Sequence, residues 1–160
     1  MERRALLESD LKDPYTLPDL GDAGTRHEVN VFVFRRGSQG VRYLLVQSAP
    51  RIESFWRPLV RTVGLDEDLF VASLNAVRFE TGLDRSFDLR TPAVGVVRDL
   101  GDLRLIDWPV GMELHDPDVR VRSSGRLAAA WRSFDEALRT LGDPTHRQNL
   151  LQVHWSVAAA

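Results

Sequence analysis

The spacing of apolar and polar positions predicts alternating strands and helices from residue 28 onward. In residues 29–34 apolar side chains stand on both faces of the pattern, which predicts a strand covered on both sides. Residues 36–40 are typical of a hairpin turn, and residues 41–46 of the returning strand. A third strand is expected over residues 56–63, where Pro58 implies a bulge or a sheet edge.

Residues 66–79 have the clearest helical pattern. We expect Asp66 to cap the first turn and Gly82 to end the helix, because aspartate accepts hydrogen bonds from free N–H groups and glycine adopts the left-handed conformation. Two apolar stripes at helical spacing predict a helix covered on two sides. The first stripe comprises Phe70, Leu74 and Val77, and the second comprises Ala72, Ala76 and Phe79.

The rest of the chain continues the alternation. Residues 92–100 and 103–112 are expected to be strands joined at Gly101-Asp102, and residues 127–131 another strand. Ser133 is expected to cap a helix over residues 134–141, and Asp143-Pro144 to open a last helix. This order fits a mixed sheet between helices. We expect one domain over residues 26–157 after an N-terminal arm of residues 1–25.

Composition and charge narrow the classes of function. A chain of 160 residues with 43% apolar and 28% charged residues is typical of one soluble domain. Its net charge of −2 provides no field for a nucleic acid polymer or an anionic membrane. The sequence has no cysteine, which excludes disulfides and thiolate chemistry. Without a signal-like or membrane-spanning segment, a cytoplasmic location is expected, and the oligomeric state stays open.

The segment from residue 55 to residue 83 carries the functional signal. Phe55-Trp56-Arg57-Pro58-Leu59-Val60-Arg61 precedes Glu67, and Phe79-Glu80-Thr81-Gly82-Leu83 closes the segment. This arrangement resembles the signature of the Nudix hydrolases, which cleave nucleoside diphosphates linked to another group. The flanking segments are similar to those of the dihydroneopterin triphosphate and dATP pyrophosphohydrolase group. The resemblance implies an α/β fold, a Nudix-like α/β/α sandwich with a mixed β-sheet.

The signature is incomplete in this sequence. The family pattern is a glycine, five residues, a glutamate, seven residues, and then Arg-Glu-apolar-x-Glu-Glu-x-Gly-apolar. With Gly82 and Leu83 as anchors, Glu67 falls on the first glutamate and Glu80 on the last. The substituted positions are Arg61 for the glycine, Asn75 for the arginine, and Ala76 and Phe79 for the other two glutamates.

These substitutions argue against the family reaction. Magnesium requires hard oxygen ligands, and the resemblance implies three glutamates on one face of this segment to hold it. Only Glu80 remains as a candidate metal ligand and residual catalytic residue. The resemblance implies that Glu67 supports the loop, and a residual catalytic role for Glu67 stays open. We therefore expect a non-hydrolytic protein that needs no cofactor, with Mg²⁺ involved only if residual hydrolysis exists.

Arginine is a candidate replacement for the metal. A guanidinium group binds phosphate through two parallel hydrogen bonds without a cation, so Arg51, Arg57 and Arg61 are candidate ligand-binding residues. Trp56 can stack on a base, and Phe79 completes the candidate set. The alternative is that the arginines of the predicted strand simply face water.

Three functions remain open from the sequence. The leading hypothesis is a Nudix-fold domain that binds a small nucleotide-like phosphate ligand or a protein partner. The second is a Mg²⁺-dependent pyrophosphohydrolase that acts on a nucleoside or pterin triphosphate through Glu80 and relocated acids near the same loop. The third is a structural scaffold whose cleft is filled by Phe79.

Overall fold

The computed structural model describes residues 24–48, 55–83, 88–90, 95–115, 121 and 127–158. The strands in these ranges are β1 (Thr25–Gly37), β2 (Gly40–Ser48), β3 (Leu59–Thr62), β4 (Asp88–Arg90), β5 (Val96–Leu100), β6 (Leu103–Glu113) and β7 (Leu127–Ser133). The helices are α1 (Leu69–Thr81), α2 (Phe134–Thr140) and α3 (Pro144–Ala158). The predicted N-terminal arm lies almost wholly outside the described residues, so the division into arm and domain stays a prediction.

The described strands form one mixed sheet with β1 and β6 at its centre. These two long strands run parallel, in register from Thr25 opposite Arg104 to Phe34 opposite Glu113. Along its other edge, β1 pairs antiparallel with β3 in its first half and with β2 in its second half. β7 extends the sheet beyond β2, while β4 and β5 pair with β6. Because β3 runs antiparallel to the first half of β1, the end of β3 at Thr62 lies opposite Glu28, near the start of β1.

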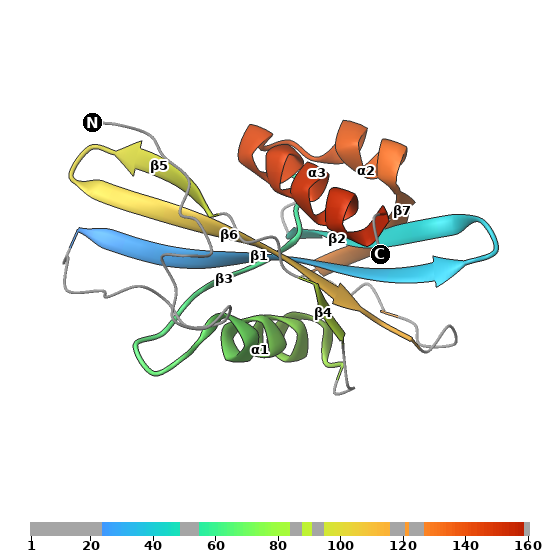
Figure 1. Cartoon of the computed structure of the whole chain (residues 1–160), viewed down its shortest axis with the longest axis horizontal. Helices are drawn as coiled ribbons and strands as arrows, with labels where there is room; N and C mark the ends of the chain where they lie inside the picture. Colours follow the sequence, from blue (N-terminus) through green and yellow to red (C-terminus); the bar gives the residue numbers. More distant parts are fainter. Residues whose placement is uncertain are drawn as a thin grey trace.

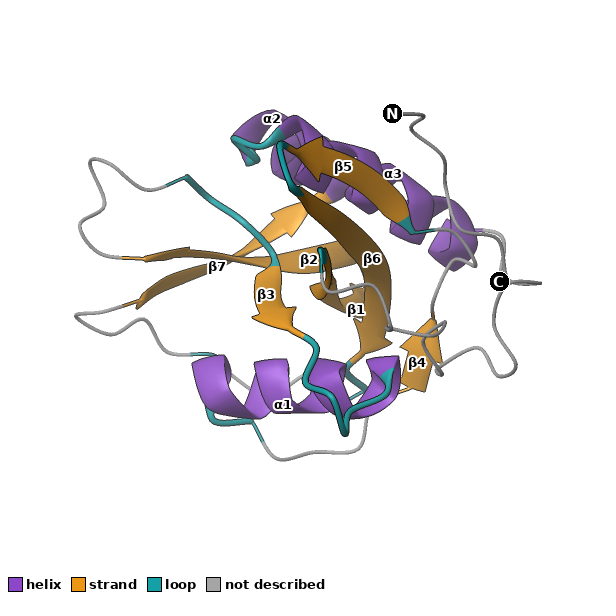
Figure 2. Ribbon diagram, turned by 90° about the vertical axis from the view of Figure 1, so that its left-hand side faces the viewer, coloured by secondary structure: helices purple, strands orange, loops and turns teal. Residues whose placement is uncertain are grey.

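Helices cover both faces of the sheet. α1 lies on one face, and α2 and α3 lie together on the other (Figure 1). The view at right angles shows the same layers, with α1 below the sheet (Figure 2). The predicted α/β/α sandwich with a mixed sheet is therefore confirmed. No helix in the described part of the chain is long and apolar enough to cross a bilayer.

Alternate side chains of β1 enter two separate cores, as the sequence pattern predicts. Val29, Val31 and Val33 pack in the core between the sheet and α1. Phe32 and Phe34 pack in the core beneath α2 and α3. Because Asn30 shares the second face with the two phenylalanines, a polar side chain lies at the edge of that core, fully buried.

The third predicted strand is shorter than expected. β3 begins at Leu59, directly after Pro58, and the two residues before the proline make only isolated bridges, Trp56 with Leu141 and Arg57 with Val46. Proline has no N–H group for a ladder, so regular pairing starts only after it. The isolated bridges carry Trp56 and Arg57 toward β2 and the end of α2.

Two expectations for the first helix are wrong. Asp68 caps α1, where its carboxylate accepts a 2.8 Å hydrogen bond from the N–H of Val71, so Asp66 is not the cap. The helix is also not covered on two sides, because its buried residues form one face and Phe79 is 85% exposed. Among the described elements, none lies outside α1 on the side away from the sheet (Figure 1), and the second stripe is partly in solvent. Gly82 ends the helix with a φ of 72°, as predicted.

Candidate functional site

Glu67 organises the loop that joins β3 to α1. Its carboxylate accepts hydrogen bonds from the N–H of Gly64 at 2.7 Å and from the side-chain amide of Asn75 at 2.6 Å. Arg61 adds an ion pair at 3.4 Å. A Cβ atom at Gly64 would stand 2.9 Å from the Glu67 carboxylate, so a side chain there would push that carboxylate away from its partners. The expectation that Glu67 supports the loop therefore agrees with its contacts.

These contacts set the charge of Glu67. Burial alone would raise the pKa of its carboxyl group, but the hydrogen bonds from Gly64 and Asn75 and the positive charge of Arg61 outweigh that effect. The net result is a pKa below the ordinary value, so Glu67 is charged at neutral pH. With its acceptor oxygens committed to the loop, it is poorly placed to serve as a metal ligand.

Glu80 is held by an arginine. Both of its carboxylate oxygens receive hydrogen bonds from Arg57, at 3.2 and 3.3 Å. The same guanidinium also donates to the hydroxyl of Ser48 and to the carbonyl of Pro58, each at 2.9 Å. The two charged side chains are only 22% and 19% exposed. Arg57 thus places an internal cation against the one carboxylate that the resemblance assigns to metal binding.

Ala76 and Phe79 stand at the other two positions where the resemblance implies a metal-binding glutamate, and one is buried while the other is exposed. Ala76 is 2% exposed and packs in the core between α1 and the sheet. Phe79 points to solvent, so it does not fill a cleft, and the scaffold role itself stays a hypothesis. No group of three or more acidic or histidine side chains suited to a metal ion occurs among the described residues. The donor set of this segment therefore does not fit the several ions that the Nudix resemblance implies.

The structure brings three of the predicted ligand-binding residues to the β3 region. Arg57 and Arg61 flank Leu59, which is fully buried, and both reach carboxylates of the α1 segment, so neither simply faces water. Arg61 also keeps a buried Nε atom without a partner. Trp56 turns to the opposite face, where it packs in the second core and lies 5.9 Å from the guanidinium of Arg132. Arg51 lies outside the described residues.

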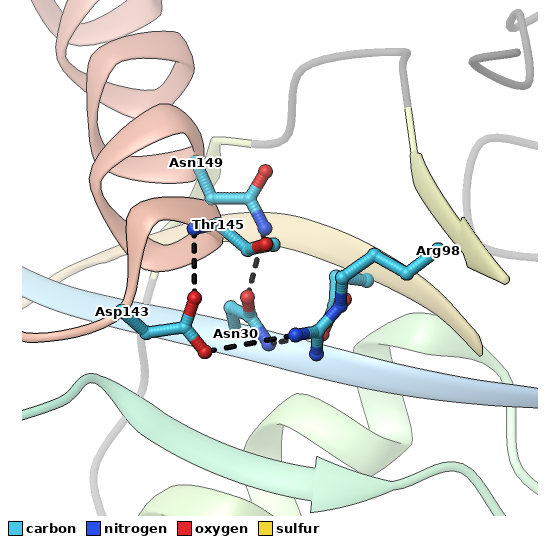
Figure 3. Close-up of polar contacts among 6 residues, drawn as sticks. Asn30, Arg98, Asp143, Thr145 and Asn149 are labelled. Carbon is cyan, nitrogen blue, oxygen red and sulfur yellow. Dashed lines mark hydrogen bonds and ion pairs between the residues drawn. The ribbon is translucent and has the colours of Figure 1, made fainter. Parts of the chain in front are cut away.

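A second polar cluster lies on the opposite face of the sheet, beneath the start of α3 (Figure 3). Asp107 is fully buried on β6 and accepts a 2.8 Å hydrogen bond from Arg98 on β5. Its other oxygen accepts from the amide of Asn30 at 3.3 Å, and Asn30 in turn accepts from Asn149 on α3 at 2.8 Å. Asp107, Asn30 and Asn149 form a chain of hydrogen bonds in which the negative charge of Asp107 orients both amides. The side-chain oxygen of Asn149 therefore lies at the end of this chain, without a partner in the described structure.

This cluster contains buried polar atoms without a hydrogen-bond partner and titratable groups whose pKa values are shifted. The side-chain oxygen of Asn149 and the Nδ1 atom of His146 are buried without a partner in the described structure. Burial lowers the pKa of His146 even though the nearby charges of Asp143 and Asp107 oppose the effect. Glu28 stands opposite Asp107 in the β1–β6 register, and burial together with that charge raises its pKa. Such combinations of desolvation and charge are common at binding sites.

Sequence reasoning missed this cluster. Asn30 and Asp107 each interrupt an apolar strand, between Val29 and Val31 and between Ile106 and Trp108, and that interruption is the signal that a polar group is buried. The partners come from segments far apart in the chain, since Asn149 follows Asn30 by 119 residues. No local pattern connects them.

Comparisons with known proteins agree on the fold. No protein-family model matches the sequence, and none of the curated proteins matches it. A Nudix hydrolase structure from Listeria monocytogenes superposes with a TM-score of 0.70 at 11% identity, over 83% of this chain and 94% of that one. An Ap4A hydrolase from C. elegans gives 0.67 at 14% identity, covering 84% and 99%. The E. coli dihydroneopterin triphosphate pyrophosphohydrolase gives 0.66 at 16% identity, covering 82% and 95%.

These likenesses define the class of the protein by its architecture. The chain has the Nudix fold, which it shares with an Ap4A hydrolase and with a dihydroneopterin triphosphate pyrophosphohydrolase. At such low identity the agreement extends to the path of the backbone and not to the chemistry of the side chains. What the site does must therefore be argued from its own residues.

Proposed function

We propose that this chain is a non-hydrolytic Nudix-fold protein that binds a small, nucleotide-like ligand through the ligand's phosphate groups. The observation that carries the proposal is the bidentate pair of hydrogen bonds from Arg57 to Glu80. In a metal-dependent hydrolase, carboxylates hold Mg²⁺, which neutralises phosphate charge and activates water. Here the remaining carboxylate instead faces a guanidinium group.

Arginine can neutralise phosphate charge as Mg²⁺ does, but it cannot activate the water that cleaves the phosphate bond. A guanidinium fork matches phosphate as well as carboxylate, so a phosphate group can compete with Glu80 for the donors of Arg57. Arg61, with its unpartnered Nε atom, offers a second donor on the same side of β3. Neither arginine can activate a water molecule, because guanidinium has no acceptor and stays protonated. Binding without turnover follows.

Thermal unfolding with a panel of nucleoside and pterin triphosphates tests this function, run once with EDTA and once with Mg²⁺. We expect stabilisation that does not depend on Mg²⁺ and no release of phosphate or pyrophosphate. Arg57→Lys keeps the charge but loses the fork, so it should reduce the thermal shift, and Arg57→Ala should abolish it. Arg104→Lys is the matched control, because Arg104 pairs with Asp99 at the far end of the sheet.

The alternatives have distinct outcomes in the same experiment. Stabilisation only with Mg²⁺, together with phosphate release, would replace the proposal with a Mg²⁺-dependent pyrophosphohydrolase acting through Glu80. A panel without any thermal shift would leave a structural or partner-binding role. An equal response of the Arg57 and Arg104 variants would show that binding occurs away from the α1 segment.

A further inference from the structure

The tip of the β1–β2 hairpin gathers positive charge in a chain whose net charge is −2. Arg35, Arg36 and Arg42 stand at this tip, and the sequence has no aspartate or glutamate between Glu28 and Glu53. In the strand register Arg35 lies directly opposite Arg42. Side chains in such a position point to the same face of the sheet, and like charges there repel each other. An anion between the two guanidinium groups would remove that repulsion.

A hollow of about 210 Å³ opens at the tip. It is lined by the three arginines, by Ser38 and Gln39, and by two glycines that add no side chain. Pockets that bury a drug-sized ligand have volumes of about 300–1,000 Å³. The hollow is smaller than these pockets, so it suits a single phosphate or diphosphate group and not a whole nucleotide.

The two opposed arginines are held in place by neighbouring side chains. The guanidinium of Arg35 lies over the ring of Trp131, 4.2 Å from the ring centroid. Arg42 donates a 2.7 Å hydrogen bond to the side-chain oxygen of Gln39. Because a guanidinium group has five N–H donors, this bond leaves Arg42 further donors for a ligand. Less side-chain entropy is lost when an anion binds to groups that are already ordered.

Two carboxylates approach these arginines, and neither lines the hollow. Glu113 pairs with Arg36 at 3.4 Å. Glu136 interacts with the charge of Arg42, yet its carboxylate accepts a 3.2 Å hydrogen bond from the N–H of Ser133 in the cap of α2. The hollow itself is therefore lined by cationic and neutral polar groups.

We propose that the tip of the β1–β2 hairpin is a separate anion-binding site, which holds the phosphate or diphosphate group of a small soluble ligand between Arg35 and Arg42. Guanidinium groups bind phosphate oxygens through paired, charge-assisted hydrogen bonds. A membrane surface suits the tip less well, because peripheral binding combines basic with apolar side chains and no large apolar side chain is exposed within residues 35–42.

This site is distinct from the pair of Arg57 and Glu80. Arg57 forms an isolated bridge with Val46, which follows Arg42 on β2 by about 13 Å of extended strand. The hairpin tip lies at the opposite end of the sheet from the β5–β6 hairpin (Figure 1). The anion site therefore does not rest on the proposed function.

An NMR titration of the full chain with diphosphate at low ionic strength, in EDTA, tests the site. The backbone N–H signals of residues 37–40 and the Nε–H signals of the tip arginines should shift and saturate. Added NaCl should weaken the binding, because the site is open to solvent. The same shifts should appear in Arg57→Ala, which removes the proposed nucleotide site. If Arg57→Ala loses them, the anion binds at Arg57 and the proposal is overturned.

Substitutions at the tip separate specific binding from a general effect of charge. Arg35→Gln and Arg42→Gln should each weaken diphosphate binding at least about tenfold, which corresponds to about 1.4 kcal/mol. Arg42→Lys keeps the charge but not the fork, so its loss should be smaller than that of Arg42→Gln. Arg139→Gln is the matched control, because Arg139 is an exposed arginine on α2 outside the hollow. Circular dichroism should show every variant folded.

Vesicles distinguish a soluble ligand from a lipid headgroup. Phosphatidylcholine vesicles with and without a phosphoinositide are sedimented with the chain, and binding of soluble diphosphate without cosedimentation supports the proposal. Cosedimentation with phosphoinositide vesicles in the absence of diphosphate binding would overturn it. A Kd for diphosphate weaker than about 1 mM, or an equal loss in Arg139→Gln and Arg42→Gln, would do the same.

Discussion

Arg57 binds Glu80 through both carboxylate oxygens, at 3.2 and 3.3 Å, and so joins the turn before β3 to the last turn of α1. The pair is a direct contact between two mostly buried side chains, and it stabilises the arrangement of the strand, loop and helix in this segment.

The strength of this pair is measurable with a double-mutant cycle. Arg57→Met, Glu80→Gln and the double variant should give a coupling free energy of about 1.5–3 kcal/mol, because both partners are mostly buried and the hydrogen bonds are charge-assisted. The pair of Arg104 and Asp99 is the control, since its 3.4 Å contact is longer and its arginine is more exposed. Its coupling should stay below about 1 kcal/mol. Equal couplings in urea unfolding would contradict a special role for Arg57.

Restoring the two missing glutamates should have opposite effects on folding. Phe79→Glu replaces an 85% exposed side chain and should change the free energy of unfolding by less than about 0.5 kcal/mol. Ala76→Glu inserts a carboxylate into the core beneath α1 and should cost about 3–5 kcal/mol. Chemical denaturation of the two single variants checks this contrast. A tolerated Ala76→Glu would show that α1 can rotate to open a metal site.

Acid should loosen the α1 loop through Glu67. Its pKa in the folded chain lies below the ordinary value near 4.5, so the carboxylate stabilises the fold above that value and loses its contribution as pH falls through the folded pKa. Glu67→Gln should remove this dependence and cost about 1.5–3 kcal/mol at neutral pH through weaker hydrogen bonds to Gly64 and Asn75. Urea midpoints at pH 7 and pH 4 measure both effects.

Gly64→Ala provides an independent check of that loop. The added methyl group meets the Glu67 carboxylate, so the variant should destabilise the wild-type background more than the Glu67→Ala background. Equal losses in the two backgrounds would mean that the glycine is required for another reason.

The sequence predicts those features of the structure that depend on residues close together in the chain. The cap at Ser133, the end of α1 at Gly82 and the two-faced strand at β1 each depend on neighbouring residues, and each is confirmed. The pattern places Phe79 in an apolar stripe, yet no helix or strand that the structure describes covers that side of α1. The contact between Arg57 and Glu80 spans 23 residues and the Asn30–Asn149 bond spans 119. Such pairings depend on how the sheet places its strands, which periodicity does not encode.

The buried carboxylate of Asp107 depends on Arg98. Arg98→Met should destabilise the chain by about 3–5 kcal/mol, because Asp107 is fully buried and loses the cation that contacts it at 2.8 Å. Adding Asp107→Asn should recover part of the loss, since the neutral amide needs no cation. Arg104→Met, which breaks the more exposed pair on the same hairpin, should cost less than about 1 kcal/mol. A double variant no more stable than Arg98→Met alone would assign the effect to packing or to the lost ion pair of Arg98 with Asp143 at 3.6 Å.

His27 makes folding sensitive to mild acid. It is 3% exposed, and its Nδ1 atom accepts a 3.0 Å hydrogen bond from the indole N–H of Trp108, so the folded chain holds the ring neutral. Burial lowers its pKa from 6.5 to about 4. Between these values the unfolded chain binds a proton that the folded chain does not. Stability from His27 is therefore complete above pH 6.5 and declines toward pH 4, by at most about 1.4 kcal/mol per pH unit.

Urea unfolding followed by circular dichroism between pH 7 and pH 5.5 measures this decline before most carboxyl groups titrate. His27→Leu should flatten the pH dependence and lower stability at pH 7, because the indole N–H of Trp108 then lacks an acceptor. If the His27→Leu chain retains the wild-type slope, His27 is not the source of the acid sensitivity.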